Sequence, residues 1–306
     1  MSTTFWFRRL LWLILGSGLL LGRGAATPAD LPDARAEAAT RALSVEATAA
    51  DRYWAGSPAG AMSLYQEALK QWHALDDIHG IIRCRTSMFG LLRETTDAAV
   101  RAEWLRQTRE IWGTYQATAG PTGAQPSAEF WRSQILIQHS ILLAALEAQP
   151  PDLAAGGEAL REARRAAGRL PAGEQRVWQL ALGNLEARLH LAGGDAAAAA
   201  RLLEAPVATY AELGRDRDAV REVALNRFLA ARLLQDQHRW PEAVARLETA
   251  LDGFRLLGQT EWMQACLGNL VDVSRHQGRE ETARQYQLRL DALRRALAPE
   301  TKSTAP

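Results

Sequence analysis

Apolar residues recur at intervals of three and four from about residue 32 to about residue 298, and this spacing constrains the fold more than any other feature. One stretch illustrates it, because a single predicted helix face carries Ala61, Tyr65, Ala68, Leu69 and Trp72. The region is rich in alanine, leucine, arginine, glutamate and glutamine, which all favour helix. It contains none of the runs of valine, isoleucine and threonine that are typical of strands. The sequence therefore predicts an all-α fold.

Short turn signals divide this helical pattern into segments. They are Gly56-Ser57-Pro58, Gly120-Pro121-Thr122-Gly123, Pro150-Pro151-Asp152, Leu170-Pro171-Ala172-Gly173 and Gly193-Gly194-Asp195. Glycine and proline are the residues that most strongly interrupt helices. Pro58 and Pro241 each fit the first turn of a helix, where the missing N–H is not needed. We therefore expect many short-connected helices rather than a few long ones.

The chain also resembles itself at a fixed offset. When the sequence is aligned with itself so that Ala61 falls on Ala243, Cys84 falls on Cys266. Further matches pair Tyr65, Ala68 and Leu69 with Leu247, Ala250 and Leu251, and a third copy contains Ala199 and Leu203. The step from Leu213 to Leu257 indicates a repeat of about 44 residues. Such a unit is long enough for two helices of about 17 residues each with their turns.

Several segments of this repeat resemble the tetratricopeptide repeat family in its longer bacterial variety. They are Gly56-x4-Ala61-x3-Tyr65, Gly194-x4-Ala199, Trp240-x2-Ala243-x6-Ala250 and Gly278-x4-Ala283. The resemblance implies a right-handed superhelical solenoid of about six helical hairpins over residues 35–298, with its weakest register in residues 78–170. The expected hairpins are 35–76, 78–118, 127–169, 173–214, 216–258 and 259–298.

The N-terminal segment has the pattern of an export signal. Positions 1–26 contain Arg8, Arg9 and Arg23 and no acid, and positions 10–22 carry no charge. That run is shorter than the roughly 20 apolar residues that span a bilayer, and it fits a secretory signal. We expect a signal peptide over 1–26, cleaved after Ala26, with an uncleaved anchor as the alternative. Residues 27–34 would be a linker and 299–306 a disordered tail. The protein would then be periplasmic, or anchored in the inner membrane and facing the periplasm.

Charge and motifs exclude several classes of function. Without residues 1–26 the chain has 33 basic and 35 acidic residues, which is not the basic footprint of a nucleic-acid-binding protein. The six histidines show no metal-ligand spacing, and neither a phosphate-binding loop nor a nucleophile motif occurs in the body. We therefore predict no cofactor, no metal and no enzymatic activity. Cys84 and Cys266 occupy equivalent repeat positions far apart in a solenoid, so we expect both to be small buried thiols rather than a disulfide.

The predicted function is a non-enzymatic scaffold or adaptor of the cell envelope that binds a protein or peptide. In the tetratricopeptide family the first helix of each hairpin lines a concave groove. The resemblance transfers that groove to Asn184, Arg188, Phe228, Arg232, Asp272 and Arg275. Two arginines on neighbouring hairpins suit a partner with an acidic side chain or a free C-terminus. The alternatives are a membrane-anchored assembly factor that uses its outer surface, and an enzyme with an unrecognised site; membrane contact is expected only through the N-terminal segment.

Overall fold

The computed structural model describes residues 33–54, 57–95, 97–118, 126–205, 207–213 and 216–297. The predicted signal or anchor, most of the predicted linker and the predicted tail lie outside these residues. Within them the chain is all-α, with thirteen helices and no strand. Among these helices none combines the length and the apolar composition that a membrane span requires.

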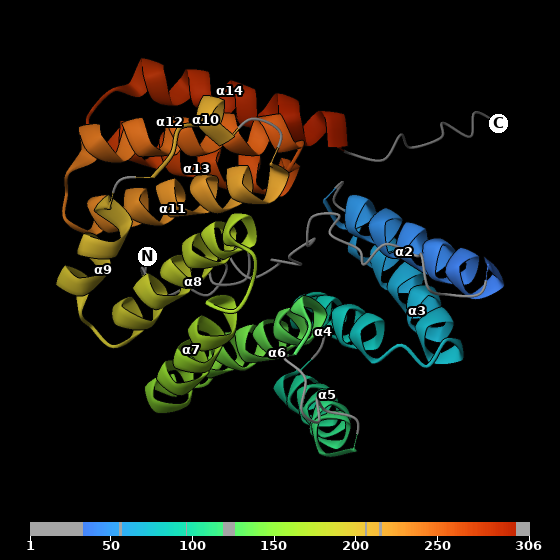
Figure 1. Ribbon diagram of the computed structural model, residues 1–306. Helices are drawn as coiled ribbons and strands as arrows, with labels where there is room; N and C mark the ends of the chain where they lie inside the picture. Colours follow the sequence, from blue (N-terminus) through green and yellow to red (C-terminus); the bar gives the residue numbers. More distant parts are fainter. Residues whose placement is uncertain are drawn as a thin grey trace, which may run out of the picture.

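The helices pair in chain order, which is consistent with helical hairpins (Figure 1). Their bounds are α2 Asp33–Trp54, α3 Pro58–Ala74, α4 Ile78–Thr95, α5 Ala98–Thr118, α6 Ala128–Glu147, α7 Leu153–Ala167, α8 Ala172–Ala192, α9 Ala196–Glu204, α10 Tyr210–Leu213, α11 Arg217–Asp236, α12 Trp240–Leu257, α13 Thr260–His276 and α14 Glu280–Leu297. The most extensive contacts join α2 to α3, α6 to α7, α11 to α12 and α13 to α14. Less extensive contacts join α4 to α5 and α8 to α9.

One turn geometry recurs at five of the helix junctions. The residues with positive φ are Asp76 (53°), Gly194 (80°), His238 (59°), Gly258 (71°) and Gly278 (69°). In each turn the next N–H donates to the carbonyl five positions earlier: Asp77 to Trp72, Asp195 to His190, Arg239 to Leu234, Gln259 to Phe254 and Arg279 to Ser274, over 2.8–3.1 Å. This hydrogen bond closes the last helical turn and directs the chain into the next helix. Glycine adopts this backbone without strain, whereas Asp76 and His238 adopt it at some cost.

The offset found in the sequence relates helices in corresponding places of the structure. The offset that pairs Ala61 with Ala243 carries α3 onto α12 and the start of α4 onto that of α13. Ala61 and Ala243 are both fully buried, as are Ala68 and Ala250. The thiols of Cys84 and Cys266 are free, fully buried and held in separate apolar clusters. Equivalent sequence positions therefore have equivalent burial at the two ends of the chain.

The fourth pair departs from the expected pattern of two helices of similar length. Its second helix, α9, has only nine residues, and the four-residue α10 follows after a break. The sequence has a proline at position 206, between them, and proline ends a helix because it lacks an N–H and clashes with the preceding turn. Tyr210 of α10 packs against α12, where its hydroxyl donates to the carbonyl of Thr249 over 2.9 Å.

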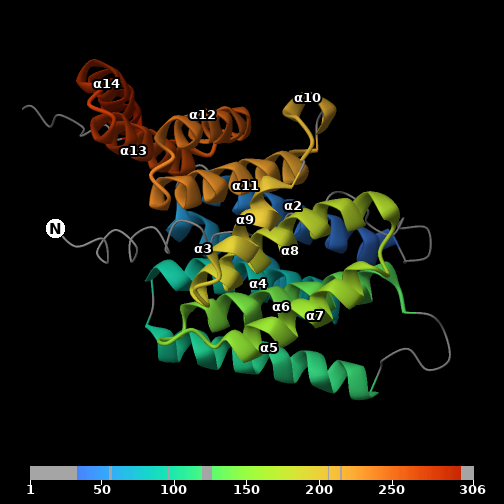
Figure 2. The same ribbon diagram turned by 90° about the vertical axis from the view of Figure 1, so that its left-hand side faces the viewer.

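The pairs follow a curved path (Figures 1 and 2). The first helices of successive pairs touch one another, α4 with α6, α6 with α8 and α8 with α11. Figure 2 shows α2 behind α8 and α11. A guanidinium nitrogen of Arg217, at the start of α11, lies 4.0 Å from a carboxylate oxygen of Asp51 in α2. The fifth pair thus returns to the side of the first.

Candidate functional site

A chain of charges links the first helices of the first four pairs. Glu46 of α2 accepts a hydrogen bond from Arg83 of α4 at 3.2 Å, and Arg83 lies 3.8 Å from Glu129 of α6. Glu129 pairs with Arg132 at 2.7 Å, and Arg132 pairs with Glu174 of α8 at 2.6 Å. We call these five residues the charge ladder. It fixes the relative positions of α2, α4, α6 and α8, because each step requires its partner within ion-pair distance.

The ladder is shielded from solvent at its start. The side chain of Glu46 also accepts a hydrogen bond from the indole nitrogen of Trp72 at 3.1 Å. The guanidinium of Arg83 lies over the same indole, 5.1 Å from the ring centroid. Although burial opposes it, the attraction of Glu46 and Glu129 raises the pKa of Arg83. Removing one member of such a shielded pair leaves the other charge without compensation.

Polar contacts continue from α8 to α11. The side-chain amide of Asn184 donates to the carbonyl and to the carboxylate of Glu222, over 3.0 and 3.1 Å, and accepts from Asn226 over 3.2 Å. Glu222 in turn pairs with Arg221 at 3.1 Å, and Asp218 lies 3.6 Å from Arg221. Burial is the main reason why the pKa of Asp218 is raised to about 6. These contacts fix the α8–α11 junction.

Two of the six predicted groove residues belong to this packing. Asn184 is only 4% exposed, and its side-chain amide is hydrogen-bonded to Glu222 and Asn226. Phe228 is fully buried and meets Trp262 edge-to-face, with ring centroids 5.5 Å apart. Both side chains pack between helices and present little or no surface to a partner.

The other four predicted residues keep access to solvent. Arg188 and Arg232 are partly exposed, and Asp272 and Arg275 are exposed. Arg188 lies on α8 one turn beyond Asn184, and Arg232 lies on α11 one turn beyond Phe228. Because α8 and α11 touch, the two arginines lie on neighbouring helices.

Arg188 is the most unusual of these four residues. Among the residues that the structure describes, its side chain has neither an ion pair nor a hydrogen bond. Burial lowers the pKa of its guanidinium to about 9, so the group is still charged at neutral pH. The side chain of Arg188 is thus partly exposed, although its charged group is largely desolvated. A carboxylate brought to it would relieve that desolvation through a charge-assisted hydrogen bond.

Arg232 lies among polar groups from α11 and α13. It donates to the side-chain oxygen of Asn269 over 3.3 Å. Burial lowers its pKa, and Asp236 and Asp272 act in the opposite direction. Although Asp272 keeps solvent access, partial desolvation of its carboxyl raises the pKa, against the effect of the nearby Arg275. Arg232, Asp272 and Arg275 are therefore brought into one neighbourhood.

The sequence pattern did not single out Asn269 and Asp236 as members of this group. Asn269 lies three positions before Asp272 on α13, and Asp236 lies four positions after Arg232 on α11. Residues at these spacings lie on the same helix face. Helical periodicity in the sequence could therefore have identified Asn269 as a neighbour of Asp272, and Asp236 as a neighbour of Arg232. Across the described residues no group of three or more histidine, cysteine, aspartate or glutamate side chains is arranged to hold a metal ion.

Comparisons with known proteins found no matching family model, no matching curated protein and no matching solved structure.

Proposed function

We propose that the chain is a non-enzymatic scaffold of the cell envelope that binds a protein or peptide along its first helices. The proposal takes the tetratricopeptide-like solenoid suggested by the sequence as its architecture. It is supported by the order of helix pairs, by the buried repeat positions and by the contacts between successive first helices. The export pattern of residues 1–26 supports the envelope location, which a fusion of residues 1–40 to a reporter active only outside the cytoplasm would test.

The observation that carries the proposal is the uncompensated guanidinium of Arg188 on α8, which contacts α11, the helix of Arg232. Desolvating a charge costs free energy, and the described residues supply no partner that offsets the cost at Arg188. A partner with an acidic side chain or a free C-terminal carboxylate would supply it, and the planar guanidinium can bind such a group through two hydrogen bonds. Arg232 would bind a second acceptor of the same partner. The near-neutral body of the chain fits a peptide better than a nucleic acid.

An array of peptides with free and with amidated C-termini tests this function. We expect carboxylate-bearing peptides to bind, and the double variant Arg188→Ala/Arg232→Ala to weaken that binding at least tenfold, since a desolvated charged contact contributes about 2–5 kcal/mol. The melting temperature should change little, because removing Arg188 also removes its desolvation cost. Arg201→Ala, at an exposed arginine of α9, is the matched control. A folded double variant that binds every peptide like the wild type would refute the proposal.

A further inference from the structure

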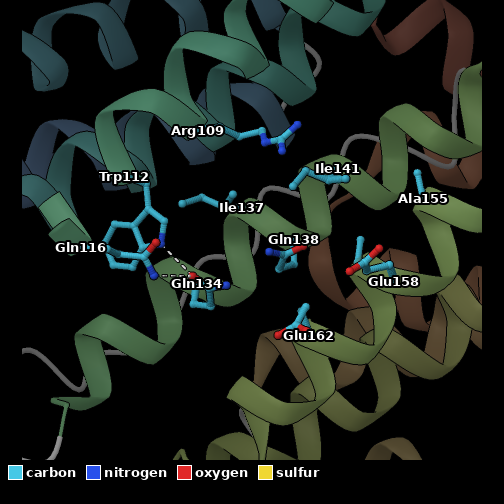
Figure 3. A pocket seen from close by; sticks show the side chains of 11 residues that line it. Arg109, Trp112, Gln116, Gln134, Ile137, Gln138, Ile141, Ala155, Glu158 and Glu162 are labelled. Carbon is cyan, nitrogen blue, oxygen red and sulfur yellow. Dashed lines mark hydrogen bonds between the residues drawn. The ribbon is translucent and has the colours of Figure 1, made fainter. Parts of the chain in front are cut away.

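The structure contains a cleft that shares no residue with the proposed binding surface. It lies between α5 and α7, is floored by α6, and has a volume of about 410 Å³ (Figure 3). The lining residues that matter most are Arg109 and Trp112 of α5, Gln138 and Ile141 of α6, and Glu158 and Glu162 of α7. Contact between α5 and α6 is less extensive than at the other junctions between consecutive long helices, which leaves this space open.

All three helices face the cleft with the same periodicity. The lining residues span 109–116 on α5, 134–141 on α6 and 155–162 on α7, and within each span the first and last lie seven positions apart, with the others three or four positions from an end. Each helix therefore presents about two turns, or about 10 Å of its length. Three parallel or antiparallel helix faces around one gap form the kind of trough into which a further helix packs.

The two walls of the cleft have opposite charge. Arg109 extends over the cleft from α5, and Glu158 and Glu162 face it from α7 (Figure 3). Within the described part of the chain, Arg109, Gln138 and Glu158 have no hydrogen bond or ion pair. Glu162 pairs with Arg165 at 3.0 Å. The floor between the walls is half apolar: α6 contributes Ile137 and Ile141 together with Gln134 and Gln138, and Ile137 lies between Ile141 and Trp112 (Figure 3).

We propose that this cleft is a docking site for an amphipathic helix of a partner protein. The helix places an apolar ridge on the isoleucines of the floor, a lysine or arginine toward Glu158 and an acidic residue toward Arg109. A helix fits better than an extended peptide, because the backbone groups of α5, α6 and α7 are used within their own helices and offer no strand edge. The volume matches the inward side chains of about two helical turns, with the rest of the helix outside the cleft.

A displayed library of helical peptides, selected on the full chain, provides the probe. Selected helices should carry an apolar ridge with basic residues on one flank and acidic residues on the other. The double reversal Arg109→Glu/Glu158→Lys should weaken their binding at least tenfold, and peptides with the two flanks exchanged should bind the reversed protein and not the wild type. Both altered side chains are exposed and unpaired within the described residues, so the variant should fold, which circular dichroism checks.

The control variant Arg201→Glu/Glu280→Lys makes the same charge changes at exposed residues of α9 and α14 and should leave binding unchanged. Arg188→Ala/Arg232→Ala should also leave it unchanged, so failure of this site and failure of the proposed function are distinguishable. The docking proposal is overturned if no selected helix distinguishes the double reversal from the wild type. It is equally overturned if the selected peptides that occupy the cleft are extended.

Discussion

The indole ring of Trp72 packs so closely on Gly80 that a Cβ added to Gly80 would lie 2.6 Å from the ring atom Cγ. The equivalent pair in the later copy of the repeat is Phe254 and Trp262, whose rings stack with centroids 5.1 Å apart. Each junction buries one tryptophan, contributed by α3 in the first case and by α13 in the second. The close-packed interior is therefore filled in two ways: a large ring against a glycine at the first junction, and two stacked rings at the second.

Gly80→Ala should lower the free energy of unfolding by about 1–3 kcal/mol, because the added methyl group overpacks the Trp72 ring. Urea denaturation followed by circular dichroism measures the change. Adding Trp72→Phe should recover only the part of the loss that comes from overpacking, because it also removes the indole N–H that donates to Glu46.

The matched control is Gly113→Ala in α5, where an added Cβ meets nothing within 4 Å. That change should raise the stability by about 0.5–1 kcal/mol through helix propensity alone. If Gly80→Ala is as stable as the wild type, Trp72 does not need the space that Gly80 leaves.

Glu46→Ala should cost about 3 kcal/mol, because it leaves the guanidinium of Arg83 and the indole N–H of Trp72 without their acceptor in a shielded site. Glu37 lies on the same helix and pairs with Arg41 at 3.7 Å, but both side chains are more than half exposed. Glu37→Ala should therefore change the stability by less than about 0.5 kcal/mol. Equal effects of the two substitutions would show that the charge ladder contributes no more than a surface ion pair.

The fold was predictable from the sequence where one residue type recurs at one position. The buried alanines at 61 and 243 recur in this way, and the offset that relates them also relates α3 to α12. The close packing of the Trp72 ring on Gly80 was not predictable. It depends on which side chain of α3 reaches the space beside that glycine of α4. The short α9 follows from the proline at position 206, which the repeat spacing alone does not reveal.

The candidate site was predictable only in part, for a geometric reason. A repeat register assigns each residue to a direction around its helix, and successive residues differ by about 100°. Register therefore selects Asn184 and Phe228 together with Arg188 and Arg232, although the first two pack between helices and the other two keep solvent access. The charge ladder was missed because three of its four steps join different helices, as Glu46 of α2 and Arg83 of α4 do, and no local spacing pairs such residues.

Asp218 should make the stability depend on pH. Burial raises the pKa of its carboxyl from about 3.8 in the unfolded chain to about 6 in the folded protein. Between these two values the folded state keeps a proton that the unfolded state has lost, so this group favours folding less as the pH rises from about 4 to about 6, and its effect is constant above that. The shift of about two pKa units corresponds to about 3 kcal/mol.

Asparagine is neutral at every pH and resembles the protonated aspartic acid in shape. The advantage of Asp218→Asn over the wild type should therefore grow between about pH 4 and pH 7, by up to about 3 kcal/mol. Urea denaturation of both proteins across that range measures the difference, in which all other titrating groups cancel. Asp252→Asn, at an exposed ion pair with Arg255, should differ from the wild type by less than about 0.5 kcal/mol throughout. A difference for Asp218→Asn that stays flat or shrinks as the pH rises would mean that Arg221 compensates the buried carboxylate fully.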